Sequence, residues 1–283
     1  MEKGIGTFLE YLANQKKCSP NTLAAYRNDL NQLVTYIEAE RAKGLVNSNS
    51  ELLKCYLLNL REKRYAPATS ARKIASAKSF FKFMVNSGKS RENPAKSIVS
   101  PRVSKHSPSF LSLLEYNRLL AEPQKLSTPA AKRDIVMLEL LYATGLRVSE
   151  LVSLNVDDVD LGRSGVRCVH SDSKRRIPFD HHINQLMRDF LKNDRLDLLY
   201  NDKEEALFLN CRGNRLTRQG FWQILKNYAS KAGLGDKITP HTLRHTFAIN
   251  KLRSGVDLQS VQQVLGHAYI SSTRIYKRPI SSR

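Results

Sequence analysis

Paired cysteines, long apolar runs and a secretion signal are all missing from this sequence of 283 residues. No apolar stretch approaches the roughly 20 residues that a membrane-spanning helix needs, and the N-terminus lacks the charged-then-apolar pattern of a secretion signal. The four cysteines are Cys18, Cys55, Cys168 and Cys211. No two of them form a Cys-x-x-Cys pair, so neither a zinc site nor a disulfide framework is predicted. A reduced, cytoplasmic setting is expected.

Acidic side chains are also scarce, with 26 Asp and Glu against 46 Lys and Arg, which gives a formal net charge of +20 and a pI near 9.9. This excess of positive charge favours a polyanionic partner, most often nucleic acid, although a ribosome-associated or merely basic protein would share it. The densest basic stretch runs from Arg61 to Lys96 and contains only two acidic residues, Glu62 and Glu92. A solvated helix face usually mixes both signs, so phosphate contact is predicted for this stretch.

The first third of the chain has the pattern of a helical domain. Ser19-Pro20 and Pro67 are helix start signals, because serine caps a helix and proline suits its first turn. Apolar residues follow each signal at helical spacing. From Val99 to Ser109 the sequence is rich in serine and proline and poor in apolar residues, which is typical of a linker. We predict an N-terminal domain at residues 1–98, a linker at 99–110 and a C-terminal domain at 111–283.

The C-terminal domain combines helices with a short β segment. Helical spacing predicts helices at about 130–143, 182–199, 218–232, 243–254 and 258–265, and Gly145 interrupts the helical pattern after the first. Val159–Phe179 instead has β character with a polar turn at 170–173, which predicts a small hairpin or three-stranded sheet. The predicted fold class is therefore mainly α, with two domains and a small antiparallel β-sheet in the second.

Three short segments of the C-terminal domain carry polar residues at characteristic spacings. They are Ala143–Leu151, with Arg147; Thr239–Ala248, with His241 and Arg244; and Val264–Tyr276, with His267 and Tyr276 nine residues apart. A lone His-x-x-Arg carries little weight, but the three segments in this order resemble the tyrosine recombinase (phage integrase) family, and in size and layout its Xer-like branch. The resemblance covers nearly the whole chain. Ser19–Leu30, and Lys78–Phe83 followed by Asn93-Pro94, are similar to the family's N-terminal SAM-like core-binding domain.

The resemblance implies a catalytic role for each of these side chains. Arg147 and Arg244 correspond to the family's two catalytic arginines, and guanidinium groups suit phosphoryl oxygens because they are planar, bidentate and always charged. His241 and His267 correspond to histidines that donate to the phosphate or move protons near neutral pH. Tyr276 corresponds to the nucleophile, and its phenol needs a neighbouring cation or base because a free phenol has a pKa near 10. The sequence has no acidic cluster resembling a two-metal nuclease, so neither a metal nor another cofactor is expected.

The catalytic lysine of the family has no clear counterpart here. The family places it in a Gly-Lys-Gly turn of the β-hairpin, whereas this sequence has His170–Pro178, and an ungapped alignment from Val166 puts Ser171 at that position. Lys174 is the nearest lysine, and it is the candidate general acid. The alternative is that Lys174 and the two arginines after it only contact phosphates.

One further histidine and one further tyrosine near these motifs are set aside as catalytic candidates. His245 is expected to be structural, and Tyr269 is a poor rival nucleophile.

The C-terminal end departs from the family. Only seven residues follow Tyr276, whereas Xer-like relatives carry a further helix that docks on a neighbouring protomer. We therefore expect either a differently built subunit contact or a shortened or mobile-element variant.

By resemblance, the two domains form a C-shaped clamp around duplex DNA. The implied function is site-specific recombination through a 3′-phosphotyrosyl intermediate, in dimer resolution or in the integration and excision of a mobile element. Four protomers, identical or paired with a paralogue, would act on two DNA sites in the cytoplasm, at the nucleoid. Two alternatives stay open: a type IB topoisomerase-like enzyme that relaxes DNA, and a catalytically impaired DNA-binding homologue.

Overall fold

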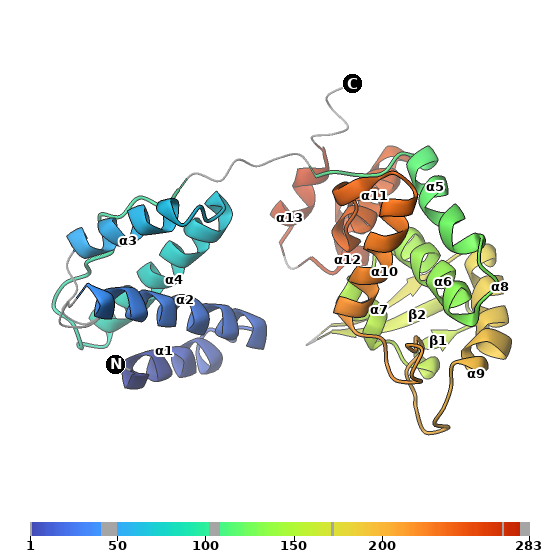
Figure 1. Cartoon of the computed structure of the whole chain (residues 1–283), viewed down its shortest axis with the longest axis horizontal. Helices are drawn as coiled ribbons and strands as arrows, with labels where there is room; N and C mark the ends of the chain where they lie inside the picture. The colour runs from blue at the N-terminus through green and yellow to red at the C-terminus, as the bar shows by residue number, and fades with distance from the viewer. Residues whose placement is uncertain (1, 41–49, 102–107, 171–172, 268, 278–283) are drawn as a thin grey trace. The chain divides into compact units, whose positions relative to one another are not determined.

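The computed structural model describes the chain except for residues 1, 41–49, 102–107, 171–172, 268 and 278–283 (Figure 1). The side chains of residues 2–3, 169–170, 173–174, 236 and 277 also lie outside the description. The chain divides into two compact units, Met1–Lys105 and His106–Arg283. Most of the described residues are helical, as the sequence predicts.

The first unit is built from four helices: α1 Glu2–Asn14, α2 Pro20–Ala39, α3 Ser50–Glu62 and α4 Pro67–Asn86. The start signal at Ser19 is confirmed, because its hydroxyl accepts a hydrogen bond from the Thr22 backbone N–H at 3.2 Å. The apolar faces of the four helices pack into one core around Phe8, whose ring meets that of Phe80 edge to face. Burial of these apolar faces holds the unit together.

One buried carboxylate, Asp29 of α2, joins two helices of this unit. Asp29 is 1% exposed and pairs with Arg72 and with Lys73 of α4. Lys73 is itself 3% exposed, and its ammonium group also donates to Gln32 and lies over the ring of Tyr65. Phosphate contact is predicted for the whole basic stretch that includes Lys73, but for Lys73 the prediction is wrong because its charge is already paired inside the unit.

The second unit holds the remaining described helices and the sheet. Its α-helices are α5 Leu113–Gln124, α6 Pro129–Thr144, α7 Val148–Ser153, α8 His181–Asp189, α9 Arg195–Asp197, α10 Arg218–Lys231, α11 Pro240–Arg253, α12 Leu258–Leu265 and α13 Ser271–Arg274. Shorter turns are η2 Val156–Asp158, the π-turn η3 Phe190–Asp194, η4 Gly235–Lys237 and η5 Ile275–Lys277. Phe110 and Leu111, at the end of the predicted linker, pack within this unit, and the Leu111 N–H donates to Thr246 of α11 at 2.8 Å.

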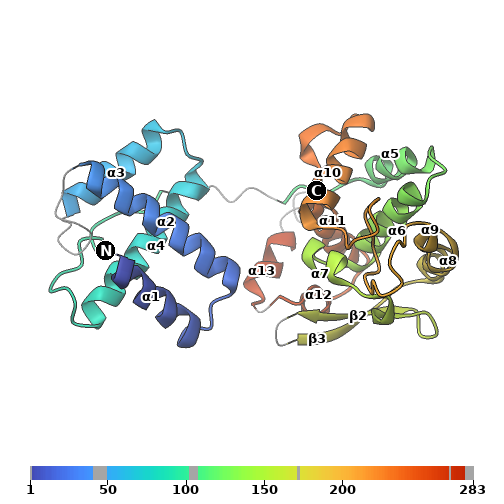
Figure 2. The same cartoon turned by 60° about the horizontal axis from the view of Figure 1, so that its bottom comes forward.

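The predicted small antiparallel sheet is confirmed, with strand order β1 Val159–Asp160, β2 Gly165–His170 and β3 Ser173–Pro178. Val166 of β2 pairs with Ile177 of β3, and both side chains are buried in the core. Successive side chains of a strand point to opposite faces. Arg175 therefore shares the inward face of β3 with Ile177, whereas Arg176 is exposed. In Figure 2 the β2–β3 hairpin lies close to α12.

Two glycines end helices where the chain turns toward the candidate site residues. Gly145 follows α6 and Gly266 follows α12, each with a φ of +62°, a left-handed conformation that favours glycine. A Cβ atom at Gly266 would lie 2.6 Å from the Arg175 guanidinium, and one at Gly145 would overlap the ring of Phe247. The two turns therefore depend on glycine twice, for backbone conformation and for space.

No helix among the described residues is long and apolar enough to cross a membrane.

Candidate active site

Five of the six predicted site residues come from the helix ends and turns of the second unit. Arg147 precedes α7, His241 and Arg244 lie on the first turns of α11, His267 follows α12, and Tyr276 lies in η5. Arg147, Arg244, His267 and Tyr276 gather around the C-terminal end of α12, as the contacts below show. His241 stands at the edge of this group, with its ring 6.3 Å from that of His245.

A buried carboxylate, Glu150 of α7, binds the guanidinium groups of the site. It accepts hydrogen bonds from the Arg147 backbone N–H at 2.7 Å and from the Arg147 guanidinium at 2.9 Å. Arg175 of β3 donates to both Glu150 oxygens at 2.9 Å, and Arg244 Nη1 lies 4.0 Å from one of them. Burial raises the pKa of Glu150, but the Arg147 backbone hydrogen bond and the charges of Arg175 and Arg147 outweigh burial and keep the pKa below its usual value. Three cations thus surround one anion, which leaves an excess of positive charge.

The same three arginines donate to three successive carbonyl groups at the end of α12. The pairs are Arg175 Nε with Val264 O at 3.0 Å, Arg244 Nη2 with Leu265 O at 2.6 Å, and Arg147 Nη2 with Gly266 O at 2.9 Å. The last carbonyls of a helix have no partner within the helix and carry partial negative charge. The arginines therefore fix the helix end from which the chain continues to His267 and Tyr276.

Arg244 is the most enclosed of the three cations. It is 4% exposed, and its Nη1 donates to Gly145 O at 2.6 Å. Burial lowers the pKa of Arg244 to about 10, with the neighbouring charge of Arg147 acting in the same direction. The group is still a cation at neutral pH. Arg147 differs because its side chain is 30% exposed and can be reached from solvent.

Tyr276 is buried, with 2% exposure, and its hydroxyl lies 2.9 Å from His245 Nδ1. Burial raises the pKa of Tyr276, and the charges of Arg244 and Arg147 offset this only in part. Burial, together with the charges of His241 and Arg244, lowers the pKa of His245 to about 4, so that His245 is neutral at pH 7. A neutral His245 that carries its proton on Nε2 accepts the phenol's hydrogen bond at Nδ1.

The ring of His267 also lies near that of Tyr276, with the two centroids 6.4 Å apart and the ring planes nearly parallel. Its Nδ1 is 2.9 Å from the Thr273 hydroxyl, and Thr273 is fully buried. Burial and the positive charges of Arg244, Arg147 and Arg175 lower the pKa of His267 to about 4. At neutral pH this imidazole is therefore uncharged and can accept a proton as well as donate one.

The side chain of Lys174 lies outside the described residues, as do Ser171 and the tip of the hairpin. Its backbone belongs to β3 and pairs with Val169 of β2. Lys174 as general acid stays a prediction.

A cavity of about 600 Å³ opens beside His241. The first turns of α10 and α11 both line it, after their N-caps Thr217 and Thr239. Helix N-termini present free N–H groups and partial positive charge, so they favour anions. Arg218 and the 44% exposed Trp222 line the same cavity. It offers a charged donor and a stacking surface next to an exposed histidine.

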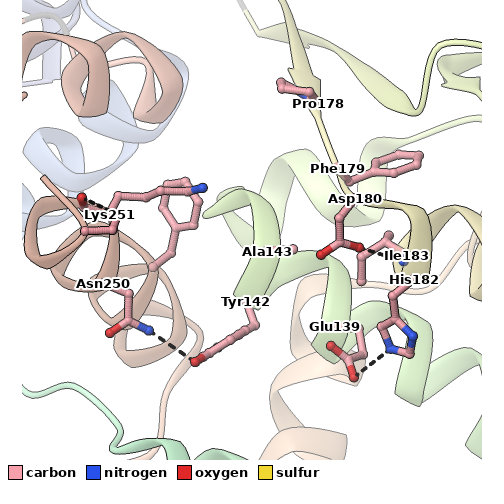
Figure 3. A pocket seen from close by; sticks show the side chains of 12 residues that line it. Glu139, Tyr142, Ala143, Pro178, Phe179, Asp180, His182, Ile183, Asn250 and Lys251 are labelled. Atoms are coloured by element: carbon pink, nitrogen blue, oxygen red, sulfur yellow. Dashed lines mark hydrogen bonds and ion pairs between the residues drawn. The ribbon is translucent and has the colours of Figure 1, made fainter. Parts of the chain in front are cut away.

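A second cavity, of about 590 Å³, lies on another side of α11 (Figure 3). Tyr142 and Asn250 are hydrogen-bonded in its wall at 3.1 Å, and Glu139 lies 3.5 Å from His182. None of the predicted site residues lines this cavity. It is therefore separate from the candidate active site.

Two residues with direct contacts in the site, Glu150 and His245, were not predicted as site residues from the sequence. Arg175 was named there only as an alternative phosphate contact, whereas its hydrogen bonds go to Glu150 and Val264. Glu150 has a local signal, because it lies three residues after Arg147 at a position suited to bind back to the backbone N–H before a helix. Arg175 and His245 lie 25 and 31 residues from Glu150 and Tyr276, the groups that they bind. No group of three or more His, Cys, Asp or Glu in the described part of the chain is placed to hold a metal ion.

Comparison with family models gives two matches. Residues 109–282 match the model described as the phage integrase family, and residues 5–88 match the phage integrase N-terminal SAM-like domain.

Relatives and solved structures agree with these matches. A tyrosine recombinase XerC of Roseiflexus castenholzii is 44% identical over 98% of this chain and 88% of its own length. A tyrosine recombinase XerD of Oceanobacillus iheyensis is 39% identical over 100% and 96%. Among solved structures, XerA recombinase has 27% identity and a TM-score of 0.54 over 97% of this chain and 92% of that one. XerH bound to a palindromic difH substrate in a post-cleavage complex is similar in fold, with 23% identity and a TM-score of 0.75 over 97% and 91%.

Proposed function

The chain belongs to the phage integrase family of tyrosine recombinases, and we propose that Tyr276 is the residue with which it cleaves and rejoins DNA. Enzymes of this family perform site-specific recombination, and this chain is one of them. The alternatives considered from the sequence, a type IB topoisomerase-like enzyme and a catalytically impaired homologue, are not favoured by the relatives that the chain matches.

In the proposed reaction, the Tyr276 phenolate oxygen attacks the scissile phosphorus and forms a 3′-phosphotyrosyl bond. The bond between phosphorus and the 5′-oxygen breaks, and that oxygen takes a proton and leaves as a 5′-hydroxyl. A 5′-hydroxyl of the partner strand then attacks the phosphotyrosine, which releases Tyr276 and reseals the DNA. The observation that carries this proposal is the close approach of Tyr276 to His245, His267 and the arginine pair.

The arginines have the role of electrostatic stabilisation. As the phosphorus becomes five-coordinate, negative charge grows on the non-bridging oxygens, and fixed guanidinium groups stabilise it. Arg147 has the solvent-accessible donors, and Arg244 supplies a buried positive charge. His267 and the exposed His241 are proposed as further donors to the phosphate or as carriers of protons.

His245 is proposed as the group that first accepts the phenolic proton. Its Nδ1 is already within hydrogen-bond distance of the Tyr276 hydroxyl and is neutral at pH 7. Because Tyr276 is 2% exposed, η5 must shift or open before its oxygen can reach a phosphate in a duplex. The 5′-oxygen needs a separate acid, and Lys174 is the proposed one, since a side chain near the hairpin tip can reach a neighbouring duplex.

Duplex DNA is the proposed substrate of both units. The cavity beside His241 brings two helix N-termini and Arg218 toward one place, which suits a backbone phosphate next to the scissile one. In the first unit, exposed cations such as Arg61, Lys82 and Lys89 remain for phosphate contact. We propose that the two units close around the duplex as a C-shaped clamp, with residues 99–110 as the linker between them.

The assembly proposed for recombination is four protomers on two DNA sites, either four copies of this chain or two copies with two of a paralogue. Strand exchange needs two duplexes that are each cleaved on both strands, so one protomer per cleaved strand accounts for four. We propose a cytoplasmic, nucleoid-associated role for this activity, in dimer resolution or in integration and excision.

A nicked suicide substrate tests the role of Tyr276, since loss of the short 5′ fragment traps the covalent intermediate. We expect Tyr276→Phe to bind the site with unchanged affinity and to form no adduct, because the variant lacks only the attacking oxygen. Tyr269→Phe, which alters an exposed tyrosine seven residues earlier, is the matched control and should form the adduct at the normal rate. An adduct with Tyr276→Phe, or its loss with Tyr269→Phe, contradicts the assignment.

A further inference from the structure

Arg175 occupies an inward position on a strand that otherwise supplies core and surface residues. Its side chain is 13% exposed, whereas its neighbour Arg176 is exposed and donates to the Arg163 carbonyl. An arginine on the inward face of a sheet needs internal acceptors, because burying an unpaired charge is costly. The acceptors of Arg175 all belong to the candidate active site.

Each nitrogen of the Arg175 guanidinium has a different environment. Nη2 donates to both oxygens of Glu150, and Nε donates to Val264 O at the end of α12. The third nitrogen, Nη1, is buried without a hydrogen-bond partner among the described residues. It lies against Gly266, where a Cβ atom would be 2.6 Å away. One side chain therefore ties β3 to α7 and to the end of α12.

The other two arginines can bind a phosphate as well as the end of α12. Arg147 and Arg244 donate to Gly266 O and Leu265 O in the free protein. A guanidinium has five N–H groups, and the recorded contacts of Arg147 and of Arg244 use only some of them, so both can also bind a phosphate. Arg175 differs because its hydrogen bonds all go to Glu150 and to Val264 O, so it holds the end of α12 through contacts that take no part in phosphate binding.

We propose that Arg175 is a positioning residue of the recombinase site: it holds Glu150 and the end of α12 in place while Arg147 and Arg244 turn their donors toward the scissile phosphate. This rests on the proposed roles of those two arginines. Arg175 does not itself touch the reacting atoms. It sets the position of Arg147 through Glu150 and the position of the Tyr276 segment through Val264.

Three variants test the proposal. Arg175→Gln removes the charge and the fork of donors, Arg175→Lys keeps the charge but loses the fork, and Arg176→Gln is the matched control on the outward face of the same strand. Each protein is measured below its unfolding temperature, for DNA affinity and for the single-turnover rate of adduct formation on the suicide substrate. We expect Arg175→Gln to lower the rate by about 100-fold, the cost of a small misplacement of reacting groups. Arg175→Lys should recover part of this rate, while DNA affinity and the Arg176→Gln rate stay near those of the unchanged protein.

Two modified substrates separate positioning from other roles. A methylphosphonate at the scissile position lacks one charged non-bridging oxygen, so misplaced arginines matter less, and the defect of Arg175→Gln should shrink several-fold. A 5′-bridging phosphorothiolate has a leaving group that needs no proton, and it should leave the defect unchanged. Rescue by the phosphorothiolate would make Arg175 a proton donor, and an unchanged defect on the methylphosphonate would make it a fold-supporting residue. Either result overturns the proposal, as does a normal rate for Arg175→Gln on unmodified DNA.

Hydrogen exchange decides the positioning claim without any chemistry. In Arg175→Gln the backbone amides of residues 264–276 should exchange faster than in the unchanged protein, and in Arg176→Gln they should not. Unchanged exchange in this segment overturns the proposal. If the protein without any substitution forms no adduct, this result contradicts the proposed function and not the role of Arg175. The hydrogen-exchange result then still decides whether Arg175 positions residues 264–276.

Discussion

Each unit contains a buried carboxylate surrounded by cations, and the two clusters differ in how their charges balance. In the first unit, Asp29 pairs with Lys73, which is fully enclosed, and with Arg72 at the surface. In the second unit, Glu150 faces three guanidinium groups, and all three also donate to carbonyls at the end of α12. In the first cluster two cations share one anion, and the enclosed Lys73 has Asp29 and Gln32 as acceptors. The second cluster has three cations for one anion and lies next to Tyr276, the proposed nucleophile, and this larger surplus of positive charge favours an anion.

The largest expected effect comes from removing a cation of the second cluster. Arg147→Ala should lower the rate of adduct formation by about 100- to 1,000-fold, the usual cost of losing one donor to a developing oxyanion. Its affinity for the site should fall far less, because many other cations share the phosphate contacts. Single-turnover cleavage and a binding titration measure the two quantities. Arg188→Ala, which removes an exposed arginine of α8, is the control. Equal losses of binding and cleavage would mean that Arg147 serves to bind DNA and does not stabilise the transition state. The two clusters would then not differ in the way described above.

In the first cluster the same kind of change should act on folding instead. Asp29→Ala leaves Lys73 buried without its carboxylate, so the free energy of unfolding should fall by about 3 kcal/mol. Urea unfolding measures this, with Glu38→Ala as control, since Glu38 is an exposed acid on the same helix. The cleavage rate of the molecules that remain folded should be unchanged. A cleavage defect at full folding would place Asp29 among the groups that support the reaction.

The Lys174→Ala variant tests whether a cation of the hairpin also takes part in the reaction, as general acid. Lys174→Ala should cleave normal DNA about 100-fold more slowly, the lower end of the range for a lost general acid. It should be largely rescued on a 5′-bridging phosphorothiolate, whose leaving group needs no proton. Slow cleavage of both substrates, or of neither, would exclude the general-acid role and leave Lys174 as a phosphate contact.

The smallest effect concerns the histidines beside the second cluster. The pKa of His245 is about 4 in the folded protein against 6.5 for a free imidazole. The unfolded chain therefore binds a proton more readily between these values, and the free energy of unfolding should fall as the pH is lowered from 6.5 toward 4, by at most about 1.4 kcal/mol per pH unit for each such histidine. In His245→Gln this slope should be shallower. His181→Gln, at an exposed position, should keep the original slope, and an unaltered slope in His245→Gln would mean that His245 is not the titrating group.

The helices of both units could be predicted from the sequence because their causes are local. The predicted bounds 258–265 are those of α12, and Ser19 caps α2 as its position before Pro20 indicates. The motif residues Arg147, Arg244 and Tyr276 could be singled out because their spacing resembles a family. Glu150 and His245 could not be singled out, and Arg175 was named only as an alternative phosphate contact, since the contacts of these residues are with partners on other elements. Lys73 was predicted to contact phosphate but is buried against Asp29. The sequence could not show this, because nothing local distinguishes Lys73 from the exposed cations around it.

The three capped carbonyls at the end of α12 also bear on which anions the site accepts. A free phosphate or sulfate ion finds only part of each guanidinium open, because Leu265 O and Gly266 O already accept from Arg244 and Arg147. Such an ion brings no other contacts to compensate for the donors that are already taken. A phosphate within a duplex arrives with its neighbours bound along the same surface, and their contacts add to those of the open donors. The internal acceptors thus make the site selective for polymeric over small anions, so millimolar phosphate in a buffer should inhibit cleavage only weakly.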